Sequence, residues 1–181
     1  MEAVGTDAQA AGNPLKDGVV LPEGFRLSAS TVAGLGRQLQ RVFELSVREV
    51  AGAYYTSAQV EAWLKSGSPA LWEDMGAAGF QFFLVFVDRT DELAAFLSVN
   101  AEGYVHALFV HPRFVRKGLA TSLLDAARTY AARHGASGLH AEVSRAARAF
   151  FEKQGFRVEK REVVLRDGEA LERFLMRGCC G

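Results

Sequence analysis

The patterned part of the chain begins with a short apolar strand followed by two helices. Residues Phe25 to Ser28 alternate as a strand does, and from Thr31 to Val50 apolar side chains recur every three or four positions. That spacing predicts an amphipathic helix, which the stretch Gly52 to Tyr55 ends. Thr56 or Ser57 then has the side chain needed to cap a second helix.

Three apolar strands are predicted in the middle of the chain. Phe80 to Val87 and Leu93 to Val99 are separated by the polar residues 88–91, which predicts a hairpin. Tyr104 to Val110 is a nearly continuous apolar run. Such runs are typical of strands buried on both faces, so this strand is expected near the centre of a sheet.

A helix–strand–helix pattern follows. The helix is predicted over Lys117 to His134, with Gly135 in position for a left-handed C-cap. Leu139 to Val143 then predicts a strand parallel to the preceding one, because a helix crosses over between them. Ser144 is expected to cap a further helix over Arg145 to Gln154.

The last two predicted strands form a hairpin. Residues Arg157 to Leu165 and Glu169 to Met176 flank the dipeptide Asp167-Gly168, a strong hairpin-turn signal. Together the elements predict a single α/β (α+β) domain built around a mixed sheet.

Composition narrows the class of protein. The chain has 181 residues, 49% of them hydrophobic, and a formal net charge of zero, as expected for one globular domain without the basic excess of a nucleic-acid-binding protein. No run approaches the ~20 apolar residues that span a bilayer, so no membrane association is expected. Small and polar residues predict a flexible N-terminal extension over residues 1–24. The adjacent Cys179 and Cys180 suit neither a disulfide nor a metal site, which favours a reduced, cytoplasmic protein.

A small basic turn is the first candidate for a functional site. Arg116, Lys117 and Gly118 stand at the start of the Lys117–His134 helix, where free backbone N–H groups and the helix dipole favour a phosphate. Gly118 and Ala120 leave the backbone accessible, and Thr121 adds a hydroxyl. The alternative is a solvated turn with a conformationally required glycine. Neither a GxxxxGK[ST] loop nor a GxGxxG turn occurs, which argues against a nucleoside triphosphatase or a dinucleotide enzyme.

The stretch VHPRFVRKGLATSLL resembles the acetyl-coenzyme A signature of the GNAT N-acetyltransferases, a strand followed by [QR]-x-x-G-x-[GA] opening a helix. A second segment, SRAARAFFEKQGF from Ser144 to Phe156, resembles the later motif of the same family at the expected separation. The resemblance covers Phe25 to Met176. The stretch Ser46 to Trp63 and the last hairpin are similar to a bacterial subgroup of small acetyltransferases.

The resemblance implies a domain over residues 25–178, with a mostly antiparallel mixed sheet of about seven strands and flanking helices. It also implies acetyl-CoA as cosubstrate, no metal, and a V-shaped opening between two splayed parallel strands. The coenzyme residues carried over are Leu108, Phe109, Val110, Val115, Arg116, Lys117, Gly118, Leu119, Ala120, Thr121, Ala147, Phe150 and Phe151.

Three residues are candidates for proton transfer. His106 is the first candidate base, because this strand position often carries a base in the family and an imidazole pKa near 6.5 suits neutral pH. The alternative is a buried structural histidine. Glu142 is the second candidate, although it could instead pair with Arg145 or bind the acceptor. Ser144 matches the Asn/Ser position of the motif, where it caps a helix and could return a proton.

Two positions depart from the family pattern. Val115 replaces the usual [QR], with little expected loss because backbone N–H groups hold the phosphates. Phe151 stands where many members carry a tyrosine thought to protonate the leaving thiolate. A thiol pKa near 8.5 makes the thiolate a fair leaving group without it.

The acceptor is expected to be a small amine, with a protein amino group as an alternative and a homodimer allowed. The candidates for binding it are Ser46, Tyr54, Tyr55 and Trp63. Aromatic residues at this spacing are more often core residues, which is the alternative for Tyr54, Tyr55 and Trp63. A different class of protein, a non-catalytic acyl-CoA-binding module, also fits the motifs, especially given Phe151.

Overall fold

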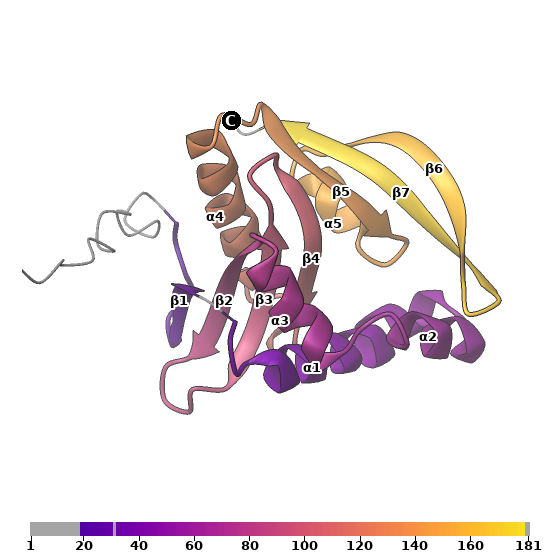
Figure 1. The fold of residues 1–181 in the computed structure, drawn as a ribbon, viewed down its shortest axis with the longest axis horizontal. Coiled ribbons are helices and arrows are strands. Elements are labelled where there is room, and N and C mark those ends of the chain that lie inside the picture. Colours follow the sequence, from indigo (N-terminus) through magenta and orange to yellow (C-terminus); the bar gives the residue numbers. More distant parts are fainter. Residues whose placement is uncertain (1–18, 31, 180–181) are drawn as a thin grey trace, which may run out of the picture.

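Seven strands form one sheet in the order β1-β2-β3-β4-β5-β7-β6 in the computed structural model, which describes residues 19–30 and 32–179 (Figure 1). Every neighbouring pair is antiparallel except β4–β5, which is parallel. This confirms the predicted mixed sheet with one parallel pair. The strands are β1 (Phe25–Ser30), β2 (Gln81–Val87), β3 (Leu93–Val99), β4 (Tyr104–Val110), β5 (Gly138–Ser144), β6 (Arg157–Arg166) and β7 (Glu169–Cys179).

Helices cover both faces of the sheet, with α1 and α3 on one side and α4 on the other (Figure 1). The helical elements are α1 (Gly36–Leu45), the π-helix η1 (Ser46–Ala51), the 3₁₀ turns η2 (Gly52–Tyr54) and η3 (Pro112–Phe114), α2 (Ser57–Leu64), α3 (Pro69–Ala77), α4 (Leu119–Arg133) and α5 (Arg148–Lys153). The single helix predicted over Thr31 to Val50 is thus wrong in its bounds: α1 starts only at Gly36, and the segment from Ser46 onward is a π-helix.

Local capping defines the two short helices. The Thr56 hydroxyl accepts from the N–H of Gln59 and the Gln59 side chain accepts from the N–H of Thr56, a capping box that starts α2. The predicted cap is therefore confirmed. Helix α3 was not predicted, although Ser68 accepts from the N–H of Leu71 and Pro69 occupies its first turn. Its nine residues are too short for a clear apolar period.

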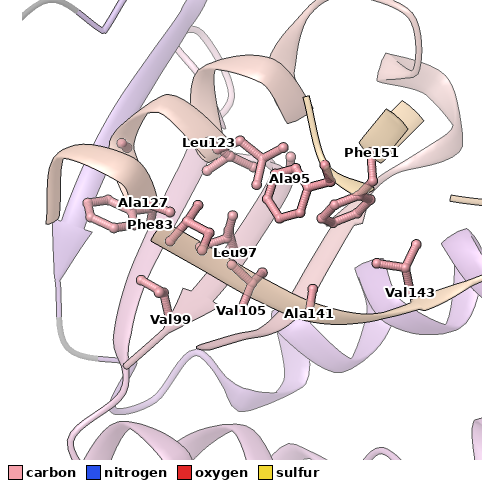
Figure 2. Close-up of a cluster of buried hydrophobic side chains, with 14 of the residues drawn as sticks. Phe83, Ala95, Leu97, Val99, Val105, Leu123, Ala127, Ala141, Val143 and Phe151 are labelled. Atoms are coloured by element: carbon pink, nitrogen blue, oxygen red, sulfur yellow. The ribbon is translucent and has the colours of Figure 1, made fainter. Parts of the chain in front are cut away.

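The core of the sheet is centred on β3, whose seven residues are all buried. On the α4 side, Phe83 and Leu97 from the sheet pack with Leu123 and Ala127 of the helix, and the cluster continues to Phe151 of α5 (Figure 2). The prediction that Tyr104 to Val110 would be buried on both faces is wrong. Part of β4 lines open cavities instead.

Strands β4 and β5 share only two register pairs, Tyr104 with His140 and Val105 with Ala141. Beyond Val105 the two strands diverge, as Figure 1 shows. By contrast, β5 is paired with β7 along its entire length. The sheet therefore opens between β4 and β5.

The β6–β7 hairpin lies beyond β5 at the edge of the sheet and curves toward α2 (Figure 1). Its turn has positive φ at both Asp167 (48°) and Gly168 (83°), the geometry of the predicted two-residue turn. Helix α2 holds the hairpin tip. The Gln59 side-chain amide donates to the Ala170 carbonyl at 2.8 Å, and Lys65 forms an ion pair with Asp167.

The chain ahead of β1 runs against α4. Val19 and Leu21 pack on the core cluster, and the Ser122 hydroxyl donates to the Val20 carbonyl. The predictions for residues 1–18 and Cys180 lie outside the described residues, while Cys179 is an exposed free thiol. Within residues 19–30 and 32–179, no helix has the length and apolar character needed to cross a membrane.

Leu123→Ala should lower the free energy of unfolding by about 2–5 kcal/mol, because Leu123 is 0% exposed and its truncation leaves a cavity under the sheet. Leu165→Ala, the same change at a side chain that is 77% exposed, should stay within about 0.5 kcal/mol of wild type. Urea denaturation measures both. Equal losses would mean that the core is not centred where the structure puts it.

Candidate active site

Two cavities meet at the opening between β4 and β5. The first, which we call the hairpin cavity, has a volume of about 190 Å³ and lies between β4, β5, the β6–β7 hairpin and aromatic side chains of α1–α3. The second, the turn cavity, has about 400 Å³ and lies between the end of β4, η1, α5 and residues 115–121. The residues lining both cavities are Trp63, Leu108, Phe109, Ser144, Ala147 and Phe151.

The turn before α4 is shaped to expose backbone N–H groups. Arg116 and Gly118 have positive φ values of 60° and 85°, and such left-handed residues are typical of anion-binding backbone concavities. Helix α4 begins at Leu119, not at Lys117 as predicted. The N–H of Ser122 donates to the Gly118 carbonyl, so the N–H groups of the three residues before it lie ahead of the first intrahelical bond. The N-cap residue is Gly118, which has no side chain to accept from these N–H groups.

Twelve of the thirteen predicted coenzyme residues line the turn cavity. They are Leu108, Phe109, Val110, Val115, Arg116, Gly118, Leu119, Ala120, Thr121, Ala147, Phe150 and Phe151. The exposed Lys117 lies outside it. The π-helix η1 forms part of the opposite wall, and it brings Ser46 to the turn cavity instead of to the predicted acceptor side.

A β-bulge aims His106 into the hairpin cavity. The register passes from Ser98–Ala107 to Val99–Val105 and leaves His106 without a partner in β3. Bulges of this kind re-aim a side chain at many active sites. The His106 ring lies near three others, with ring centroids 5.8 Å from Phe80, 6.1 Å from Tyr104 and 6.5 Å from Trp72.

The surroundings of His106 favour the neutral imidazole. The side chain reaches solvent within the cavity, but the adjacent rings shield it from bulk water, and this desolvation lowers its pKa from the ordinary 6.5. The negative charge of Glu142 opposes the shift, and the positive charge of Arg166 adds to it. At neutral pH the ring is therefore able to accept a proton.

Glu142 lies in the same cavity but is not free. Its carboxylate forms an ion pair with Arg173, whose Nε also donates to Glu162 at 2.6 Å. The alternative that Glu142 pairs with Arg145 is wrong, because Arg145 lies 3.6 Å from Glu172 instead. The reason is register: Ser144 and Arg173 are neighbours across β5–β7, which brings Arg173 alongside the end of β5.

Ser144 and Tyr55 form a polar group where the two cavities join. The Ser144 hydroxyl accepts from the N–H of Ala147 at 3.3 Å, so it caps the turn 145–147, and α5 starts only at Arg148. The Tyr55 hydroxyl accepts from the N–H of Arg145 at 2.9 Å and interacts with Ser144. Burial raises the pKa of Tyr55, which keeps its proton in place at neutral pH. Phe151 is buried beside them.

Only some of the predicted acceptor residues line the hairpin cavity. Tyr55 and Trp63 line the hairpin cavity with their rings 5.5 Å apart, whereas Tyr54 is 51% exposed and lies outside both cavities. Sequence reasoning missed Trp72 and Arg166, which also line the hairpin cavity. The signal for Trp72 was the Ser68-Pro69 start of α3, and for Arg166 its place beside the Asp167-Gly168 turn.

Comparison with known proteins identifies the family to which this fold belongs. Residues 52–170 match a family model described as an acetyltransferase (GNAT) domain. The chain is 28% identical to the uncharacterized N-acetyltransferase YafP of Escherichia coli K12 over 141 residues, 78% of this chain and 87% of that protein.

Many solved structures share the fold, and two of them illustrate the likeness. A GCN5-related N-acetyltransferase from Rhodopseudomonas palustris superposes with a TM-score of 0.80 and 23% identity, covering 90% of this chain and 99% of its own. PaiA N-acetyltransferase from Thermoplasma acidophilum, solved in complex with coenzyme A, gives a TM-score of 0.70 and 17% identity over 86% and 98% of the two chains. With the family model matching more than half of its length, this chain belongs to the GNAT acetyltransferase family.

Proposed function

We propose that the protein is an acetyl-CoA-dependent N-acetyltransferase acting on a small amine. The observation that carries the proposal is the meeting of two cavities at the β4–β5 opening, one bounded by an uncapped helix start and the other by a bulged histidine. Family membership supports acyl-CoA chemistry, and the relative from Thermoplasma acidophilum was solved with coenzyme A.

The turn cavity suits coenzyme A. Free N–H groups at the start of α4, with Arg116 beside them, favour the pyrophosphate. The end of β4 has lost its partner β5, so the backbone of Leu108 to Val110 is available to pair with the pantetheine arm as an added strand would. The apolar side chains along this path, such as Phe150, would cover the arm.

The hairpin cavity suits the acceptor amine. When acetyl-CoA is bound, the amine nitrogen attacks the thioester carbonyl carbon, a C–N bond forms and the C–S bond breaks. His106 accepts the proton that the amine must lose, directly or through one water molecule, because its ring is neutral at neutral pH. A backbone N–H near Val110 stabilises the oxyanion, and such donors are worth about 3 kcal/mol.

The thiolate requires a proton, and Phe151 cannot supply one. Ser144 lines both cavities and its hydroxyl interacts with the protonated Tyr55. We infer that Ser144 or water returns the proton there, and that the negative charge of Glu142 stabilises the imidazolium formed when His106 accepts a proton. Buried Phe151 is also what favours the second candidate function, a protein that binds acyl-CoA without transferring the acyl group.

Gly118→Asp should weaken coenzyme A binding at least 100-fold, because it adds a side chain and a negative charge at the proposed pyrophosphate position. Gly135→Asp is a matched control, since Gly135 has the same left-handed backbone (φ 84°) after the other end of α4, with nothing within 4 Å of the added Cβ. Calorimetry with coenzyme A measures affinity, and thermal melting checks that both variants lose similar stability. Wild-type affinity in a folded Gly118→Asp variant would contradict the proposed coenzyme site.

His106→Gln should lower kcat for thiol release about 10²–10⁴-fold, the usual contribution of a general base, while coenzyme A affinity stays within twofold. The assay is thiol release from acetyl-CoA with a panel of amines. An unchanged kcat would remove His106 from the mechanism. Coenzyme A binding with no acceptor-dependent thiol release by the wild-type protein would favour the non-catalytic function.

The His106 imidazole should titrate below 6.5 in the folded protein, since desolvation outweighs the attraction of Glu142. Glu142→Gln should lower the pKa further, because it removes the negative charge that stabilises the imidazolium. NMR of the ring protons across pH 4–8 measures both, with the urea-unfolded chain as the reference near ~6.5. A folded-state midpoint above the unfolded one would show that the ring is stabilised as a cation.

A further inference from the structure

The hairpin cavity is lined by four charged side chains, two acidic and two basic. The acidic ones, Glu142 and Glu172, are both neutralised by arginines within the described structure. Glu142 is paired with Arg173, and Glu172 is paired with Arg161. Neither carboxylate is therefore left to bind a cationic group of a ligand.

Arg166 is different. Its half-buried side chain lines the cavity, yet its guanidinium forms no hydrogen bond or ion pair with any of residues 19–30 and 32–179. The adjacent acid, Asp167, is held by Lys65, and the cross-strand neighbour Glu169 makes no ion pair with it. The hairpin tip is fixed to α2, so Arg166 is carried on an anchored turn.

The positive charge of Arg166 acts on His106 and Tyr104, which lie in the part of the cavity where the reaction is proposed. It lowers the pKa of His106, and it also opposes the rise in the pKa of Tyr104 that desolvation and Glu142 produce. Since the paired residues largely cancel, Arg166 is the charge in this cavity that remains available to a ligand. A guanidinium presents a planar fork of donors that matches a carboxylate.

The aromatic lining and the volume of the cavity restrict the size and the apolar part of the acceptor. Phe43, Trp63 and Trp72 contribute aromatic faces. Its volume of about 190 Å³ is below the roughly 300–1,000 Å³ of pockets for drug-sized ligands, yet above the ~150 Å³ that accommodates benzene. An acceptor with about one ring fits this space.

We propose that Arg166 binds a carboxylate of the acceptor, so that the substrate is a small amino-acid-like molecule with an amine, a carboxylate and an apolar or aromatic body. This inference rests on the proposed function, in which the hairpin cavity takes the acceptor. It argues against polycationic amines, because these would need unpaired carboxylates where Glu142 and Glu172 are already neutralised.

The test compares acceptors that differ only in the carboxylate. Thiol release from acetyl-CoA is measured with phenylalanine against phenethylamine, and with 4-(aminomethyl)benzoate against benzylamine. In at least one pair, kcat/KM should be tenfold or more higher for the carboxylate member. Arg166→Gln should remove that preference, Arg166→Lys should retain part of it, and the control Glu169→Gln should leave it unchanged. No preference in either pair, or a preference that survives in Arg166→Gln, overturns the proposal.

A second measurement does not depend on turnover. Binding of 3-phenylpropanoate, which has the carboxylate but no amine, is titrated by calorimetry into the protein saturated with coenzyme A. Arg166→Gln should weaken its binding at least tenfold, with an unchanged melting temperature showing that the variant is folded. If no amine supports thiol release, the proposed function fails. This titration then decides by itself whether Arg166 binds a carboxylate. Absent binding to wild type, or equal affinity in the variant, then refutes carboxylate recognition.

Discussion

The short parallel pairing of β4 and β5 is the constraint on which the rest of the molecule depends. Two register pairs hold the strands together at one end, and past Val105 their facing backbone groups have no partner in each other. Unpaired backbone N–H and C=O groups must find water or a ligand. The opening is therefore polar along its edges although apolar side chains surround it, which is a suitable environment for an extended, amide-bearing molecule such as the pantetheine arm.

The strands stay apart because each belongs to a different half of the sheet. Strand β4 is paired with β3 in the buried centre, whereas β5 is paired along its length with β7. The β6–β7 hairpin leans away to meet α2, and Phe151 packs beneath the gap against Phe156. Closing the gap would require moving a hairpin anchored at its tip and displacing a buried ring.

Much of the fold followed from the sequence because the signals were local. The Asp167-Gly168 turn, the Thr56 cap and the apolar runs of β2, β3 and β4 each depend on residues close together in the chain. The π-helical turn after Leu45 and the bulge at His106 did not follow, because no local residue pattern distinguishes them from an ordinary helix and a regular strand.

The candidate site also has a part that the sequence predicted and a part that it did not. The proposed coenzyme turn is one continuous segment, so its residues were named from a motif and all but Lys117 line one cavity. The hairpin cavity, where we propose that the acceptor binds, is assembled from α1, α2, α3, β4, β5 and the last hairpin. No spacing rule brings Trp72 near Arg166, and the pairing of Glu142 with Arg173 depends on the register of two strands.

The attachment of the hairpin tip to α2 keeps the hairpin at the hairpin cavity and away from the turn cavity. Gln59 and Lys65 tie the tip to a helix that lies far along the chain from the turn at residues 115–121. Residues of the hairpin line the hairpin cavity, and none of them lines the turn cavity. Under the proposed function, related proteins could therefore change substrate choice by exchanging the hairpin alone, while the contacts with the coenzyme stay the same.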